Sequence, residues 1–274
     1  MRSAIVDKVV ILARGLGTRM RRPDDAAAID DRQAAIAETG IKALIPIGRP
    51  FLDYVLTVLA ETGYRRVCLV VAPEHDVIRD YYGRQVQPQH LTVEYAIQEQ
   101  PRGTADAVLA AEAFAADEPV VVLNSDNYYP AEALHALRSV DGPAVALFDR
   151  ESMLRGSNIA EDRLRQFAVA QIDDQGFLVR ILEKPDAATL ASLPQPIRLG
   201  MNCWRFDPAI FAACRAIKPS ARGELELPDA VQYAMDVLGQ RFRAVTIHAP
   251  VLDLSSRKDI AAVAARLSGR EVRF

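Results

Sequence analysis

Short apolar runs alternate with amphipathic segments along the first half of the chain. Runs dominated by Val, Ile and Leu predict buried strands at residues 8–13, 66–72, 91–98 and 120–126. Between these runs, apolar positions recur at helical spacing over residues 52–62, 74–82, 104–116 and 131–139. Apolar strands separated by helices are typical of a mostly parallel sheet with helices on both faces. Ligands of such sheets bind at the carboxyl ends of the strands.

The pattern changes after about residue 144. It predicts strands at residues 144–150, 167–172, 177–182, 199–206 and 242–248, with a hairpin turn at 173–176. Helices are predicted at residues 208–217, 228–238 and 258–267. No Ser/Gly-rich linker separates the two halves. We therefore expect one α/β domain over residues 1–274, a Rossmann-like three-layer sandwich with a mixed, mostly parallel central sheet.

The overall charge offers little long-range attraction for a polyanion. The chain has 33 Lys and Arg against 36 Asp and Glu, a net charge of −3. Binding to nucleic acid or to an anionic membrane surface is therefore not expected. Any bound anion must be held by a local cluster, which directs attention to basic residues beside glycines.

Cysteine spacing and hydropathy predict a soluble, cytoplasmic protein. Cys68, Cys203 and Cys214 show no metal-binding spacing and are expected to be buried, reduced thiols. The first apolar run, residues 9–13, is too short for a signal peptide. No segment approaches the ~20 apolar residues that span a bilayer.

The first predicted strand ends in a glycine-rich loop. Gly15 and Gly17 let backbone N–H groups approach an oxyanion, Thr18 can cap the next segment, and Arg19 adds a forked cation. The loop lacks the Gly-Lys-Ser/Thr ending of a P-loop and the third glycine of a dinucleotide fingerprint. Phosphate binding and a purely structural tight turn both explain it.

Further along the chain, Lys42 precedes the apolar run 43–47, and Gly48 and Pro50 then turn the chain into a helix. Together with the loop, this segment resembles the sugar-phosphate nucleotidyltransferases, which include the glucose-1-phosphate uridylyl-, thymidylyl- and adenylyltransferases. The resemblance implies a fold of the nucleotide-diphospho-sugar transferase type. In that fold about residues 1–143 would bind nucleotide and about 144–274 would bind the acceptor.

The same resemblance assigns roles to the loop. Arg19 would grip the phosphates that become pyrophosphate, and Lys42 would contact the α-phosphate region. Ala13, Gly15, Gly17 and Thr18 would bind the nucleotide.

The segment that begins at Gln98 resembles the family's base-reading loop. In members that use pyrimidines, a Gln and a Gly at this spacing contact the base, which implies Gln98 and Gly103, with Thr104 beside them. An amide offers a donor and an acceptor to a base edge. UTP or dTTP is therefore favoured, although residues 103–107 also resemble adenylyl-transferring members.

Two aspartates match the family's Mg²⁺ ligands. Asp126 lies in a Leu-Asn-Ser-Asp-Asn segment that resembles L-x-G-D-N, and Asp253 lies where relatives have W-x-D-x-G-T. Carboxylates suit Mg²⁺, which usually takes one or two of them together with phosphate oxygens. A turn-forming role for Asp126 and a helix-capping role for Asp253 are the alternatives.

Three segments of the second half resemble the acceptor site. Glu183 and Lys184 belong to an E-K-P motif, which implies contacts to sugar hydroxyls and to the acceptor phosphate. Arg222 opens an R-G-E-x-E segment and would lie near that phosphate. Asn202 and Ala168 occupy positions where relatives have glycine. Both changes alter the sugar pocket, so a hexose-1-phosphate and a cyclitol phosphate stay open as acceptors.

Two features depart from the family. Arg14 replaces a small residue before the first loop glycine, and either adds charge near phosphate or points outward from the turn. Between Met20 and Lys42 the chain is longer than in typical relatives, and the segment 23–40 within this stretch is either a lid or a surface insertion.

The predicted activity is Mg²⁺-dependent transfer of a nucleotide from an NTP to a sugar-1-phosphate by in-line attack on the α-phosphorus, with release of pyrophosphate. One rival is a glycosyltransferase of related fold, whose D-x-D motif lacks its first Asp here because Ser125 precedes Asp126. Another is a non-catalytic nucleotide-sugar sensor or regulatory subunit, suggested by the altered surroundings of Asp253. Relatives often form dimers or tetramers, so a homo-oligomer is left open.

Overall fold

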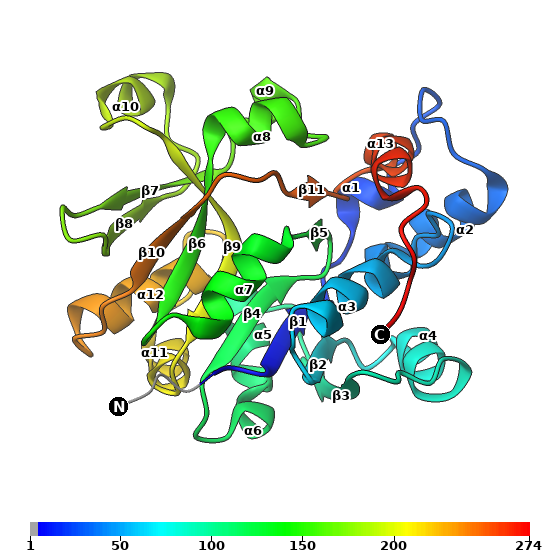
Figure 1. Ribbon diagram of the computed structural model, residues 1–274, viewed down its shortest axis with the longest axis horizontal. Helices are drawn as coiled ribbons and strands as arrows, with labels where there is room; N and C mark the ends of the chain where they lie inside the picture. The colour runs from blue at the N-terminus through cyan, green and yellow to red at the C-terminus, as the bar shows by residue number, and fades with distance from the viewer. Residues whose placement is uncertain (1–4) are drawn as a thin grey trace.

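The computed structural model describes residues 5–274, and within them a nine-stranded sheet forms the centre of the molecule (Figure 1). Its main path runs β10-β6-β9-β4-β1-β2-β3. β1 pairs in parallel with β2 and β4, while β9 runs antiparallel between β4 and β6. The strands of this path are β1 Lys8–Leu12, β2 Arg66–Val71, β3 Thr92–Ile97, β4 Val120–Asn124, β6 Ala144–Asp149, β9 Arg198–Phe206 and β10 Arg243–Ile247. The predicted mixed, mostly parallel sheet is confirmed.

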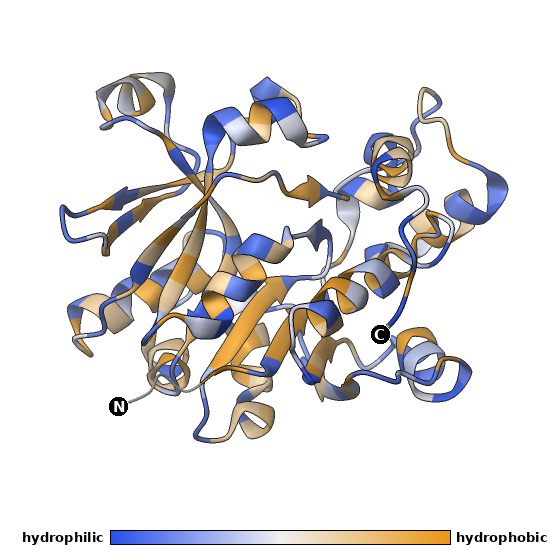
Figure 2. Ribbon diagram, viewed as in Figure 1, coloured by the Kyte–Doolittle hydropathy of each residue, from blue (hydrophilic) through white to orange (hydrophobic). Residues whose placement is uncertain are grey.

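Helices cover both faces of the sheet because its central strands are apolar on both sides. Alternate residues of β1 enter opposite cores: Val9 and Ile11 join one cluster, and Val10 joins the other. One cluster takes residues from α3 Phe51–Glu61, α7 Ala131–Ser139 and α13 Arg257–Leu267. The other takes residues from α5 Thr104–Ala110, α11 Ala209–Ala216 and α12 Leu227–Asp236. Figure 2 shows the hydrophobic strands between these layers.

Several elements were not predicted from the hydrophobic pattern, most of them because they are only a few residues long. The predicted helix 104–116 breaks at Ala111, and the predicted helix 74–82 continues as a π-turn. The hairpin predicted around 173–176 is confirmed as β7 Ala168–Ile172 and β8 Leu178–Leu182. The remaining elements are α1 Thr18–Arg21, α2 Asp31–Thr39, η1 Lys42–Leu44, α4 Asp76–Asp80, η2 Tyr81–Gln85, α6 Glu112–Ala115, β5 Asn127–Tyr128, α8 Arg150–Gly156, α9 Glu161–Leu164, α10 Ala187–Ser192 and β11 Leu252–Asp253.

The three cysteines are buried free thiols, as their apolar surroundings predict. Over residues 5–274 no helix has both the length and the apolar content needed to cross a bilayer.

A small second sheet joins distant parts of the chain. β5 directly follows β4 and pairs antiparallel with β11, so that Asp253 stands opposite Asn127. The amide of Leu254 donates to the carbonyl of Asp126 at 2.8 Å. This pairing brings residues from near the C-terminus to the carboxyl edge of the central sheet, where β1 and β4 end.

The long segment 23–40 packs against the glycine loop. Asp30 and Gln33 form a capping box at the start of α2, and Gln33 also donates to the carbonyl of Pro46 at 2.8 Å. At its far end, Gly40 meets Gly17 so closely that a Cβ on Gly17 would lie 2.2 Å from the Gly40 carbonyl oxygen. The segment therefore supports the path of the loop.

This contact predicts different tolerance at the two loop glycines. Gly17 has a φ of 61° and no room for a side chain, whereas a Cβ on Gly15 would meet no atom within 4 Å. We expect Gly17→Ala to lower the free energy of unfolding by about 2 kcal/mol or more, and Gly15→Ala to change it by less than about 0.5 kcal/mol. Denaturant titration of both variants measures this, and equal effects would contradict the packing.

Candidate active site

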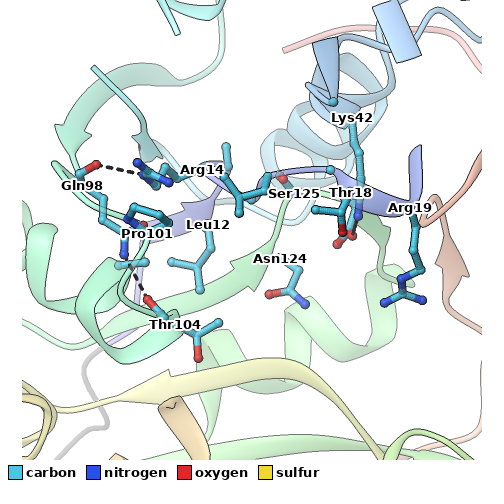
Figure 3. Close-up of a pocket in the computed structure, with 18 of the residues that line it drawn as sticks. Leu12, Arg14, Thr18, Arg19, Lys42, Gln98, Pro101, Thr104, Asn124 and Ser125 are labelled. Atoms are coloured by element: carbon cyan, nitrogen blue, oxygen red, sulfur yellow. Dashed lines mark hydrogen bonds and ion pairs between the residues drawn. The ribbon is translucent and has the colours of Figure 1, made fainter. Parts of the chain in front are cut away.

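A cavity of about 460 Å³ lies at the carboxyl ends of β1 and β4. Figure 3 shows two ends to it, one with Gln98 and Pro101 and the other with Thr18, Arg19 and Lys42. The residues from the sequence-predicted set that line it come from four separate segments: Ala13, Gly15, Gly17, Thr18, Arg19, Lys42, Gln98, Gly103, Thr104 and Asp126.

The end with Arg19 and Lys42 combines loop backbone with charged side chains. Gly17 precedes α1 in a left-handed conformation, and its carbonyl accepts from the amide of Arg21. Lys42, in η1, places its Nζ 2.7 Å from Asp126 Oδ2, and both side chains are mostly buried. This end of the cavity can therefore hold a polyanion through cations and backbone N–H groups.

The second predicted metal ligand lies beside this pair but below the cavity surface. Asp253 is 3% exposed, and its Oδ1 accepts from Asn127 Nδ2 at 3.1 Å and from Ser255 Oγ at 2.9 Å. Its Oδ2 accepts from Arg163. Burial raises the pKa of Asp253, and the neighbouring charge of Asp126 raises that pKa further, so the two carboxylates lie within each other's electrostatic field.

The alternative role of Asp253 as a helix cap is wrong. The capping box of α13 is formed by Ser256 and Asp259. Asp259 also accepts from Arg163 at 2.6 Å, so this arginine of α9 bridges two buried carboxylates.

The donor set fits Mg²⁺. A carboxylate has about four lone-pair positions, and three donors occupy those of Asp253, so one is left for an ion. Asp126 lines the cavity and supplies the open side of the pair. Hard oxygen ligands from two adjacent strands are the arrangement that Mg²⁺ takes together with phosphate oxygens.

At the opposite end, Gln98 is a buried side chain with its donors already used. Its Nε2 donates to the carbonyl of Gly103 at 3.0 Å and to Asp106 Oδ2 at 2.8 Å. Among the described residues no donor bonds Oε1, so this oxygen stays available as an acceptor. Thr104 Oγ1 accepts from the amide of Leu227 and so joins this loop to α12.

Gly103 is required by packing within the protein. A Cβ there would lie 2.4 Å from the carbonyl oxygen of Leu225. The segment after Arg222 therefore packs closely against Gly103, and this contact joins the two halves of the chain.

A second cavity of about 200 Å³ adjoins the first, and Arg19 and Asn124 line both. Glu183 and Asn202 line it with Gln166, Phe167 and Trp204. Asn202 has a φ of 50°, a conformation that Asn tolerates better than most residues, in accord with a position where relatives have glycine. This cavity has the polar and aromatic lining that a sugar requires.

Lys184 and Arg222 line neither cavity. Burial raises the pKa of Glu183, as does the charge of Glu226, and the charges of Lys184 and Arg222 oppose this rise. Arg222 is paired with Glu226, with Nε 3.2 Å from Oε1. Lys184 has a φ of 44°, a strained conformation for a residue other than glycine. Both cations therefore lie near the smaller cavity, which Glu183 lines, and their contact with a phosphate stays a prediction.

Sequence reasoning did not identify Asn127 and Arg163 as contributors to the site, and it did not predict the orientation of Arg14. Asn127 was part of a quoted motif, but only the β5–β11 pairing reveals that its amide holds Asp253. Arg163 lies in a polar helix without any motif, and no signal in the sequence distinguishes it from a solvated arginine.

A family model for nucleotidyl transferases matches residues 8–245 of this chain. The chain belongs to the nucleotidyl transferase family. The resemblance predicted from the glycine loop and the later motifs is therefore confirmed. The two adjoining cavities are the candidate binding sites for a nucleotide and for an acceptor.

Among curated relatives, a glucose-1-phosphate thymidylyltransferase from Streptomyces griseus is 31% identical over 88% of this chain and 60% of its own length. The low-salt glycan biosynthesis nucleotidyltransferase Agl11 from Haloferax volcanii is 28% identical over 84% of this chain and 57% of its own length. The chain thus spans less than two thirds of these relatives. The UTP–glucose-1-phosphate uridylyltransferase AglF from Haloferax volcanii is 27% identical over 92% of this chain and 93% of its own length.

A solved structure of UDP-glucose pyrophosphorylase complexed with UDP-glucose has the same fold. The two structures superimpose with a TM-score of 0.73 at 19% identity, over 99% of this chain and 100% of that one. The likeness confirms the nucleotide-diphospho-sugar transferase type of sandwich.

The Arg163 bridge predicts a large effect for a residue outside every motif. In Arg163→Met, Asp253 and Asp259 would be left buried without their cation, which we expect to lower the free energy of unfolding by about 3 kcal/mol. Arg165→Met is the matched control, because Arg165 is 64% exposed and pairs with the exposed Glu161; its expected change is within about 0.5 kcal/mol. Denaturant unfolding in the absence of divalent ions compares the two, and similar stabilities would argue against the bridge.

Proposed function

We propose that this chain transfers a nucleotide from an NTP to a sugar-1-phosphate, forming a nucleotide-sugar and pyrophosphate. The observation that carries the proposal is the continuity of the two cavities through Arg19 and Asn124, with the Lys42–Asp126 pair on the wall of the larger one. A nucleotide in the larger cavity would present its α-phosphate toward an acceptor in the smaller one.

The reaction is an in-line displacement. An oxygen of the acceptor phosphate forms a bond to the α-phosphorus, the bond from that phosphorus to the bridging oxygen breaks, and pyrophosphate leaves with the electron pair. The attacking oxygen is ionised at neutral pH, so the protein needs no general base. The main obstacle is repulsion between two anions, and catalysis consists of positioning them and neutralising their charge.

Each basic residue has a task in this scheme. Arg19, on the wall shared by the cavities, binds the departing phosphates, and Lys42 binds near the α-phosphate. Lys184 binds the acceptor phosphate. Asp126 and Asp253 would hold Mg²⁺, which supplies further neutralisation of phosphate charge when bound.

The arrangement of Gln98 favours UTP or dTTP. Both N–H groups of its amide are donated within the protein, so it offers the cavity an acceptor, Oε1. Uracil and thymine present a ring N–H at N3, which matches an acceptor, whereas the ring nitrogens of cytosine and adenine at their pairing edges are acceptors. The relatives from Streptomyces griseus and Haloferax volcanii, named for thymidylyl and uridylyl transfer, agree with this choice.

A substrate panel tests the proposal directly. The protein is incubated with Mg²⁺, one of five triphosphates and either glucose-1-phosphate or another sugar or cyclitol phosphate, and pyrophosphate is measured. We expect release only when both substrates are present, with UTP or dTTP as the best donor. Consumption of a nucleotide-sugar supplied in a parallel incubation, without pyrophosphate release in the panel, would favour a glycosyltransferase, and nucleotide binding without turnover would favour a sensor.

Removing a charge from the cavity should slow turnover without unfolding the protein. We expect Asp126→Asn, Arg19→Ala and Lys184→Ala each to lower kcat by about 10²–10³-fold, the usual cost of losing one preorganised electrostatic contact. Arg84→Ala serves as control, because Arg84 is 82% exposed and remote from the cavities. Near-normal turnover of Asp126→Asn would contradict the metal assignment.

A further inference from the structure

Arg14 is a buried cation without a matching anion. It is 8% exposed, and its Nε donates to the backbone carbonyl of Gln98 at 3.0 Å. Its Nη1 is buried and has no hydrogen-bond partner, and no carboxylate forms an ion pair with Arg14 in the part of the chain that the structure describes. A buried guanidinium without a counter-ion is unfavourable, so an acceptor that reaches the guanidinium from the cavity that Arg14 lines would be stabilising.

The side chain extends to the Gln98 end of the larger cavity. Figure 3 shows its guanidinium beside Gln98 and Pro101, away from Lys42, Thr18 and Arg19. This placement differs from both alternatives considered for Arg14 from the sequence. The side chain lines the cavity, so it does not point outward from the turn, and it lies remote from the cations at the opposite end.

The neighbouring His75 leaves the charge of Arg14 uncompensated. Burial lowers the pKa of His75, the charge of Glu74 opposes this shift, and the positive charge of Arg14 lowers the pKa further, which favours the neutral imidazole. A neutral imidazole adds no second positive charge beside the guanidinium and is no counter-ion to it. The backbone oxygen of Gln98 accepts from Nε of Arg14 and fixes the guanidinium beside Gln98.

We propose that Arg14 is a specificity-determining residue that reads a carbonyl oxygen on the nucleobase, in partnership with the acceptor Oε1 of Gln98. Together the two side chains match a base edge on which a carbonyl oxygen adjoins a ring N–H. Uracil, thymine and guanine carry that edge. The carbonyl in question is O4 of uracil and thymine or O6 of guanine; at that position cytosine and adenine carry an amino group beside a ring acceptor and mismatch both side chains. The inference rests on the proposed function only in taking the ligand to be a nucleotide.

Two other roles for Arg14 give different results. A contact to the triphosphate would serve all nucleotides alike, because their phosphates are the same. A purely structural role, in which Arg14 only fixes the Gln98 loop, would displace Gln98 and lower the UTP-to-CTP ratio, but it would also lower the melting temperature of the nucleotide-free protein. A role in base selection changes the ratio between nucleotides without lowering that temperature, because Arg14→Met removes a buried, unpaired charge.

The test compares UTP with CTP on the wild type, Arg14→Met and Arg14→Lys. The two nucleotides have the same phosphates and nearly the same shape, and they differ in the base edge. Dissociation constants are measured by calorimetry without acceptor, and kcat/KM is measured by pyrophosphate release. GTP and ATP form a second pair. Each ratio is taken on one protein preparation, so a partly unfolded variant does not change it.

We expect the wild type to prefer UTP over CTP, and Arg14→Met to weaken UTP binding by about 10–100-fold, the effect of losing a charge-assisted hydrogen bond. CTP binding should change by less than about threefold, and Arg14→Lys should fall between. An equal loss for UTP and CTP would overturn the inference, as would a wild type that binds both equally.

The two proposals fail separately. Selective UTP binding that depends on Arg14, without pyrophosphate release for any acceptor, would refute the proposed function and support the role of Arg14. Pyrophosphate release with an unchanged UTP-to-CTP ratio in Arg14→Met would support the function and refute that role.

Discussion

The antiparallel pairing of β5 with β11 is the constraint on which the rest of the site depends. It places Asp253 opposite Asn127, although the two residues are 126 positions apart in the chain. Asp126 precedes β5 by one residue, so the same pairing sets the separation of the two carboxylates. A site in which both carboxylates hold one divalent ion together with phosphate oxygens requires this proximity, because each carboxylate must reach the same ion.

Proximity of two carboxylates is unfavourable in a buried place, and the protein offsets it with cations. Lys42 pairs with Asp126 from the nucleotide side, and Arg163 pairs with Asp253 from beneath. Arg19 lines both cavities and adds positive charge where they meet. In the proposed function, the cations that stabilise the two buried carboxylates would also bind the phosphates of the substrates.

The sequence predicted the framework of this fold well, because the central strands carry uninterrupted apolar residues whose burial depends little on context. It also located the residues around the larger cavity, since the glycine loop and the segment at Gln98 follow strand ends. It could not predict β5 and β11, because a two-residue strand has no periodicity. Their pairing depends on how the chain closes around the sheet.

Side-chain partners were the other limit. A helix cap was a reasonable alternative for Asp253, but Ser256 and Asp259 fill that role. Gly103 was predicted to allow close approach of a base, whereas the carbonyl of Leu225 fills the space beside it. The sequence did not predict where the Arg14 side chain points, because its orientation is set by the backbone oxygen of Gln98, 84 residues away. Each of these outcomes depends on tertiary contacts that local sequence does not encode.

The central claim is that Asp126 and Asp253 share one ion. Titration of Mn²⁺ in the presence of UTP, followed by electron paramagnetic resonance, tests it on the wild type, Asp126→Asn and Asp253→Asn. We predict one tightly bound ion per wild-type chain and at least about tenfold weaker binding in each variant. Wild-type affinity for Mn²⁺ in Asp253→Asn would contradict the account.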